Sequence, residues 1–166
     1  MPAVEQAPLQ SVLIDDVTWG CATRLRRAEW VGAINDLVED ARFQVADVAA
    51  LRGYVTVHKD SIELLLHDPA GRVVEQVAWG QVLLRPLFKE YMSIVQDMVR
   101  GTRGVNSPQL EALDIAKRLT HDDAAETLQR AFRVAAPDHQ TARRLFTLLV
   151  VLTHDTTRLD GVLTSG

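Results

Sequence analysis

Residues 54–79 read YVTVHKDSIELLLHDPAGRVVEQVAW, and this stretch decides the fold class. Three runs rich in β-branched and aliphatic side chains, at 54–58, 61–67 and 72–79, are separated by two short turns. The second turn, Asp68-Pro69-Ala70-Gly71, has proline at its second position and glycine at its fourth, as β-turns favour. Three such runs joined by such short turns predict an antiparallel meander.

Helical patterns lie on both sides of the meander. Five helices are expected, and the residues that open them are capping or helix-starting types: Thr23, Pro86, Ser107-Pro108, Asp123 and Pro137-Asp138. The first helix is expected to reach about Arg42 and the third about Leu119, while Asp123 followed by Glu126 resembles a capping box. The last helix is expected to end near Thr153. Its second half, 145–152, is apolar nearly all round, which places it at the centre of the core.

The chain is therefore predicted to be one α+β domain over residues 11–157. We expect a small antiparallel meander of three to four strands, with a further short strand candidate within 11–19, packed against about five helices. The helices would form a single layer with a buried C-terminal helix. Residues 1–10 and 158–166 are expected to be loose ends. A hydrophobic content of 47% in 166 residues excludes a disordered chain and fits a domain with its own core.

Net charge and cysteine content indicate which partners and which cellular compartment the protein is expected to have. A net charge of −4 argues against a nucleic-acid partner, whose binding proteins are usually basic. The acidity lies in residues 1–79, with 7 basic and 12 acidic side chains, whereas residues 80–166 hold 11 and 10. The first ten residues lack a signal-peptide pattern, no apolar run is long enough to span a bilayer, and Cys21 is alone. We therefore expect a cytoplasmic protein with no membrane partner, and the second half of the chain is the better place to look for an anion site.

Three stretches of the second half resemble a known family. They read RPLFKEY at 85–91, SPQLEALD at 107–114 and TARRLFTL at 141–148. Together they resemble an uncharacterised family of short cytoplasmic proteins from alphaproteobacteria, of the UPF type, over about residues 54–154. Such proteins typically carry an arginine doublet and then a His-Asn-Glu-Gly loop, at the places of Lys117-Arg118 and His121-Asp122-Asp123-Ala124 here. The resemblance maps a candidate site and implies no reaction, ligand or partner.

A set of basic side chains is the leading candidate site, and it consists of Lys117, Arg118, His121, Arg143 and Arg144. The first two are expected at a helix C-terminus, where the helix dipole favours cations. The last two are expected near a helix start, where the dipole disfavours cations, so they need partners. Those partners are either internal carboxylates, with Glu111, Asp114 and Glu126 as candidates, or a bound phosphate or carboxylate.

A metal site is the minor hypothesis, because the tripeptide Thr-His-Asp occurs twice. Its ligands would be His121, Asp122, His154 and Asp155, which are of the types that bind zinc, manganese or iron. The simpler interpretation is helix capping at the first copy and, at the second, a histidine favoured by a helix C-terminus. A His-Asp phosphohydrolase needs another aspartate from a later helix, yet only 11 residues follow Asp155. We therefore expect neither a metal nor a cofactor.

Two functions fit these observations. The leading hypothesis is a non-enzymatic regulatory or adaptor protein that binds a protein partner or a small anion at the basic set. The alternative is an enzyme acting on a phosphorylated metabolite, with His121 as general acid/base and the arginines clamping the phosphate. A homodimer is expected only from the frequency of symmetric oligomers.

Overall fold

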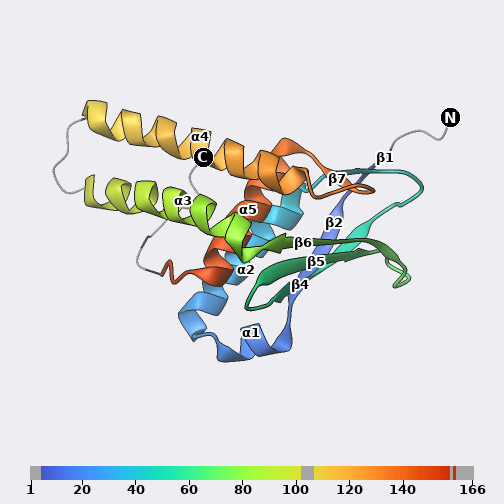
Figure 1. Ribbon diagram of the computed structural model, residues 1–166. Helices are drawn as coiled ribbons and strands as arrows, with labels where there is room; N and C mark the ends of the chain where they lie inside the picture. The colour runs from blue at the N-terminus through green and yellow to red at the C-terminus, as the bar shows by residue number, and fades with distance from the viewer. Residues whose placement is uncertain (1–4, 102–106, 158, 160–166) are drawn as a thin grey trace.

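The computed structural model describes residues 5–101, 107–157 and 159 (Figure 1). Its main sheet contains, in spatial order, β2 (Leu9–Ile14), β4 (Leu51–Val57), β5 (Ser61–His67) and β6 (Val73–Gly80). The last three strands form the predicted antiparallel meander, which is confirmed. β2 adds to the β4 edge in parallel orientation. Together with the helices, this sheet confirms the predicted α+β class.

The predicted turn between β5 and β6 is also confirmed. The amide of Gly71 donates to the carbonyl of Asp68 at 2.9 Å, and the Asp68 carboxylate accepts from the amides of Ala70 and Arg72. Gly71 has a φ of 90°, in the region that side chains with a Cβ rarely adopt. Glycine is therefore required at this turn position.

The sequence does not predict a second, small sheet. It consists of β1 (Glu5–Ala7), β3 (Phe43–Val45) and β7 (Ala136–Pro137), paired antiparallel in that order. Strands of two or three residues are too short to show the alternation from which strands are read. β1 and the start of β2 also lie within the segment 1–10 that was expected to be loose. The expected loose end at 158–166 lies outside the described residues except for Leu159.

Aspartate and threonine side chains cap the N-termini of the first two helices. Asp15 accepts a hydrogen bond from the Thr18 amide at 3.0 Å and caps α1 (Asp16–Cys21), which corrects the strand expected to continue to residue 19. Thr23 accepts from the Arg26 amide at 3.2 Å and caps α2 (Arg24–Asp40), as predicted.

Helices α3 (Gln81–Gly101) and α4 (Ser107–Gln129) differ from the prediction in two respects. α3 begins before Pro86, which lies inside the helix rather than in its first turn. α4 is continuous, so the predicted end near Leu119 and restart at Asp123 are wrong. Burial of Ala124, Ala125 and Leu128 along one face outweighs a capping preference of about 1 kcal/mol. Residues 102–106, between α3 and α4, lie outside the described residues.

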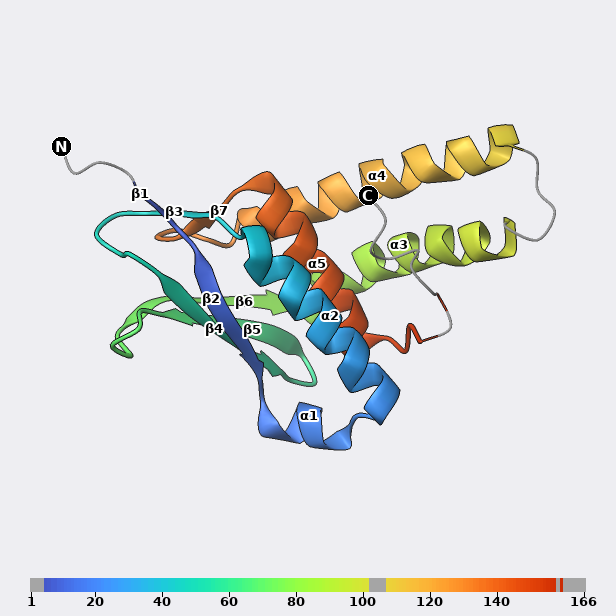
Figure 2. The ribbon, with the colours of Figure 1, turned by 180° about the vertical axis from the view of Figure 1, so that it is seen from behind.

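α5 (His139–Thr153) occupies the centre of the molecule, as predicted. Asp138 caps it by accepting from the Thr141 amide at 2.8 Å, and nine of its 15 residues are buried. α2 lies beside it, and both helices cover one face of the main sheet (Figure 2). The Nε1 group of buried Trp30 donates to the Val151 carbonyl at 2.7 Å and joins the two helices.

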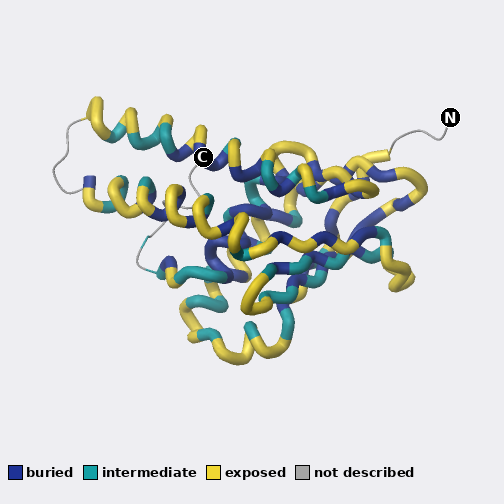
Figure 3. Tube along the Cα trace, in the orientation of Figure 1, coloured by how far each residue is buried: buried dark blue, intermediate teal, exposed yellow. Residues whose placement is uncertain are grey.

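α3 and α4 form an antiparallel pair that packs on α5 and extends beyond the sheet (Figure 1). Figure 3 shows the buried part of the chain concentrated where these helices, α5 and the sheet meet, and exposed residues along the outer sides of the pair. No helix in the described ranges is long and apolar enough to cross a membrane.

Candidate functional site

The structure separates the five predicted basic residues into three places. Lys117, His121 and Arg143 lie together between α4 and α5. Arg118 points away on the exposed side of α4, where it pairs with Asp114 one turn earlier. Arg144 points toward α2, where its Nη1 lies 3.2 Å from the carbonyl oxygen of Asp36. Lys117 and Arg118 lie near the middle of α4, so the prediction that they lie at a helix C-terminus, favoured by the helix dipole, is wrong.

His121 is a buried, neutral histidine. Its Nε2 lies 2.7 Å from the Arg143 carbonyl oxygen, which can only accept, so Nε2 carries the proton. The unprotonated Nδ1 faces the Arg143 guanidinium at 3.4 Å. Burial is the largest cause that lowers the pKa of His121 to about 4, and the charges of Arg143 and Lys117 act in the same direction. With 5% of its surface exposed, the ring is out of reach of a substrate unless helices move.

The two arginines of α5 have internal carboxylate partners. Arg143 Nε lies 3.4 Å from an Asp122 oxygen, which also accepts from His139 Nε2 at 2.9 Å. Arg144 Nη1 lies 3.4 Å from Asp40 at the end of α2. These contacts correspond to the internal ion-pair alternative, although the partners are Asp122 and Asp40 rather than the carboxylates expected. A binding role for the basic set stays a prediction.

The two Thr-His-Asp copies do not meet. The first lies inside α4, so its threonine and aspartate are not helix caps. His154 is the C-cap of α5, as predicted, and its ring lies 5.3 Å from that of Phe88. Burial, followed by the charge of Arg26, lowers its pKa, so the expected preference for an imidazolium at this helix end is wrong. Within the described ranges, no three His, Cys, Asp or Glu side chains gather where they could hold one metal ion.

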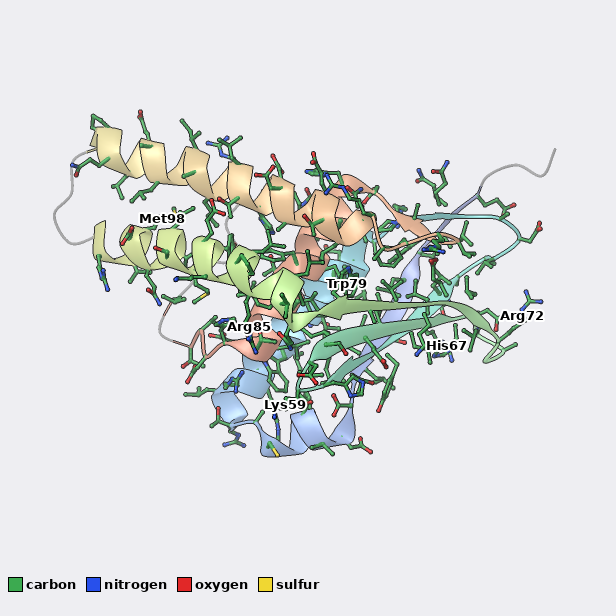
Figure 4. The ribbon with its side chains drawn as sticks, viewed as in Figure 1. Lys59, His67, Arg72, Trp79, Arg85 and Met98 are labelled. Atoms are coloured by element: carbon green, nitrogen blue, oxygen red, sulfur yellow. The ribbon has the colours of Figure 1, made fainter. Side chains whose placement is uncertain are left out.

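A pocket of about 960 Å³ opens where the first half of α3 faces the end of α5 and the start of α2. We call it the basic pocket because its charged lining residues are Arg26, Lys59, Arg85 and Lys89. Its floor is apolar and includes Phe88, Met92 and Leu152, all buried. Figure 4 shows Arg85 near the start of α3 and Lys59 below it on the same side of the molecule.

The charges of the basic pocket are not neutralised within the described chain. No aspartate or glutamate is among the described residues that line it. Within the described residues, Lys59, Arg85 and Lys89 form no ion pair. Arg26 donates from Nη2 to the Leu152 carbonyl at 3.2 Å, while its buried Nε has no hydrogen-bond partner there. The pocket is thus a positive region on a chain whose net charge is −4.

The basic pocket is not among the sites predicted from the sequence. Its four cations come from α2, the β4–β5 turn and α3, which are far apart along the chain. A signal for part of it exists, because Arg85 and Lys89 are four residues apart and therefore share one helix face. Gln81 and Ser93 continue that face at the same spacing and also line the pocket.

Comparison with known proteins places the chain in a family. The model of the "Uncharacterised protein family (UPF0262)" matches residues 6–155. The UPF0262 protein of Phenylobacterium zucineum is 33% identical over 150 residues, which cover 87% of this chain and 91% of that protein. Those of Azorhizobium caulinodans and Rhodospirillum rubrum are 32% and 27% identical, each over 87% of this chain and over 92% and 91% of their own lengths. No solved structure matches the chain. The resemblance to an alphaproteobacterial family is confirmed, and the chain belongs to the uncharacterised protein family UPF0262.

Proposed function

We propose that this protein binds a small anionic molecule in the basic pocket and acts as a binding or regulatory protein. The observation that carries the proposal is the set of four cations around one pocket with no described carboxylate among them. In the predicted basic set, by contrast, Arg118, Arg143 and Arg144 each face an internal carboxylate. The proposed anion site therefore moves from the α4–α5 contact to the α3–α5 pocket.

The lining of the basic pocket indicates the chemical class of the ligand. Guanidinium and ammonium groups form strong charge-assisted hydrogen bonds with phosphate and carboxylate oxygens. Arg85 and Lys89 are one turn apart on α3, and Lys59 approaches from the β4–β5 turn, so one anionic group can meet several donors. The side chains of Phe88 and Met92 can cover an apolar part of the same molecule. We infer a phosphorylated or carboxylated small molecule with an apolar portion.

Binding is proposed rather than catalysis because the candidate general acid/base is not placed for catalysis. His121 is not among the residues that line the basic pocket, and its Nε2 donates a hydrogen bond to the Arg143 carbonyl. His154 does line the pocket, and its Nδ1 lies 2.9 Å from the hydroxyl of the neighbouring Thr153. The single Cys21 is free and exposed, which suits a reducing compartment such as the cytoplasm.

The proposal is tested with 1-naphthyl phosphate, which combines a phosphate with an apolar ring. Isothermal titration calorimetry is expected to show that the wild-type chain binds 1-naphthyl phosphate. The double variant Arg85→Ala/Lys89→Ala should bind it at least about tenfold more weakly, because two charged donors are lost. Binding should also weaken as salt is added, since the interaction is between charges.

Arg100→Ala is the matched control, because it removes a cation from the same helix outside the pocket. Arg100 is exposed, and its contact with Asp97 is long, at 3.8 Å. This variant should bind 1-naphthyl phosphate as the wild type does. Equal binding by the wild type and Arg85→Ala/Lys89→Ala, or no binding by the wild type, would contradict the proposed site.

A further inference from the structure

The outer face of α2 is unpartnered in the described part of the chain. Its exposed positions are Arg24, Leu25, Ala28, Val31, Gly32, Asn35, Asp36, Glu39 and Asp40, and Asp40 lies 3.4 Å from Arg144. Figure 2 shows α2 in front of α5 with no other element of the described chain covering it. Leu25 and Val31 are 68% and 44% exposed, which is high for residues of this size and polarity. We call this set of residues the α2 face.

Apolar surface continues from the α2 face onto β2 and α1. A groove of about 360 Å³ is lined by Val31 and Ile34 of α2, by Asp16 and Trp19 of α1, and by three consecutive residues of β2, 12–14; Asp16 is its one charged lining residue among those described. Leu13 is 63% exposed on β2, which is an edge strand of the main sheet. An exposed apolar region next to an open strand edge is typical of a surface that another protein covers.

Charge is arranged along the α2 face in a self-complementary way. Arg24 lies at the start of the face and Glu39 near its end, and neither forms an ion pair in the described part of the chain. The midpoint between these two residues falls between Val31 and Gly32, in the middle of the face. If a second α2 packs antiparallel about that midpoint, each Arg24 meets the Glu39 of the other copy, as a two-fold interface requires.

Gly32 supports a close approach from outside the chain. A glycine inside a helix costs about 1 kcal/mol relative to alanine. Nothing in the described chain explains that cost, because a Cβ built at Gly32 would meet no atom within 4 Å. Ala28, one turn earlier, is also small and exposed. The centre of the face is therefore shaped for another helix backbone rather than for a side chain of this fold.

We propose that two copies of this chain associate through their α2 faces, antiparallel about a two-fold axis between Val31 and Gly32. The isologous contact places small residues at the centre, Leu25 and Val31 around them and the Arg24–Glu39 pairs at the rim. It is independent of the basic pocket, toward which the opposite side of α2 turns Arg26.

Sedimentation velocity of the full chain over a range of concentrations tests this proposal. We expect a concentration-dependent species of twice the 18.4 kDa mass. Gly32→Leu should remove it by preventing close approach, and the monomer should remain folded, because the added side chain points into open space and favours the helix. Leu119→Glu is the matched control on the exposed side of α4, where Leu119 is 60% exposed, and it should leave the association unchanged.

A charge swap tests the antiparallel register without changing the shape of the α2 face. Arg24→Glu alone should weaken association by placing two acidic groups together, and Arg24→Glu/Glu39→Arg should restore it, since each pair is then rebuilt with the signs exchanged. A chain that stays monomeric at all concentrations would overturn the proposal. So would a dimer that tolerates both Gly32→Leu and Arg24→Glu, or a charge swap that fails to restore association.

Discussion

Replacing Glu75 with alanine is expected to lower the free energy of unfolding by about 3 kcal/mol. Glu75 lies on the core-facing side of β6 with Val77 and Trp79, and only 8% of its surface is exposed. Its carboxylate accepts from three successive backbone amides between α4 and β7. The amides of Val134 and Ala135 lie at 2.8 and 2.7 Å from Oε2, and that of Arg133 binds Oε1. The loop thus forms an anion-binding concavity that the protein fills with its own side chain.

Removing the carboxylate leaves these amides without an acceptor, and a buried unpaired donor costs about 1–3 kcal/mol. Urea denaturation followed by tryptophan fluorescence measures the loss. Glu75→Gln should also be strongly destabilising, because one of its two side-chain atoms would then be a donor facing donors. Gln76→Ala, on the exposed side of the same strand, is the control and should change little. A Glu75→Ala variant as stable as Gln76→Ala would show that the loop does not depend on this carboxylate.

Stability is expected to fall as the pH is lowered from about 6.5 to about 4, by roughly 3 kcal/mol in total from His121 alone. The pKa of His121 is lowered from 6.5 to about 4, chiefly by burial. In this interval the histidine takes up a proton in the unfolded chain but not in the folded one. The unfolded state therefore binds more protons, and acid favours it. Above pH 6.5 the ring is neutral in both states, so His121 does not lower the free energy of unfolding there.

Urea midpoints measured at several pH values check this expectation. His121→Gln should flatten the pH dependence, whatever it does to stability near neutrality. His154, whose pKa is also lowered by burial, contributes with the same sign, so adding His154→Gln should flatten the curve further. Asp15 and Asp122 have pKa values lowered from 3.8, so they lose their stabilising effect only at more acid pH. An equal slope in the wild type and His121→Gln would contradict the buried neutral state of this histidine.

Local patterns predict the elements that local physics controls. The meander follows from alternation and turn chemistry, and the caps at Thr23 and Asp138 are where their side chains can accept the first free amides. The helix start predicted at Asp123 is wrong, because a capping motif is a local pattern and carries no information about the elements that pack against α4. These elements bury Ala124 and Leu128, and the continuous contact with α5 keeps the helix unbroken.

Pairs of basic residues along the chain were a poor guide to a shared site. Successive residues on a helix point about 100° apart, so Lys117 and Arg118 diverge, as do Arg143 and Arg144. One member of each pair turns inward to His121, and the other turns to a different carboxylate. Residues three or four apart, such as Lys117 with His121 or Arg85 with Lys89, share a face. That spacing is the better sequence signal for a helical site.

By itself, the sequence determined the α+β class, the meander, the buried last helix and the family. These properties depend on contacts between neighbours along the chain or on the overall match to relatives. The basic pocket and the α2 face were decided only by the tertiary structure. The pocket exists because folding brings the start of α2, the β4–β5 turn and α3 together. The face exists because α2 buries Trp30 and Leu37 against α5 and the sheet and leaves its opposite side uncovered. Which charges remain unneutralised and which apolar side chains remain exposed depends on these packing contacts, which no local pattern specifies.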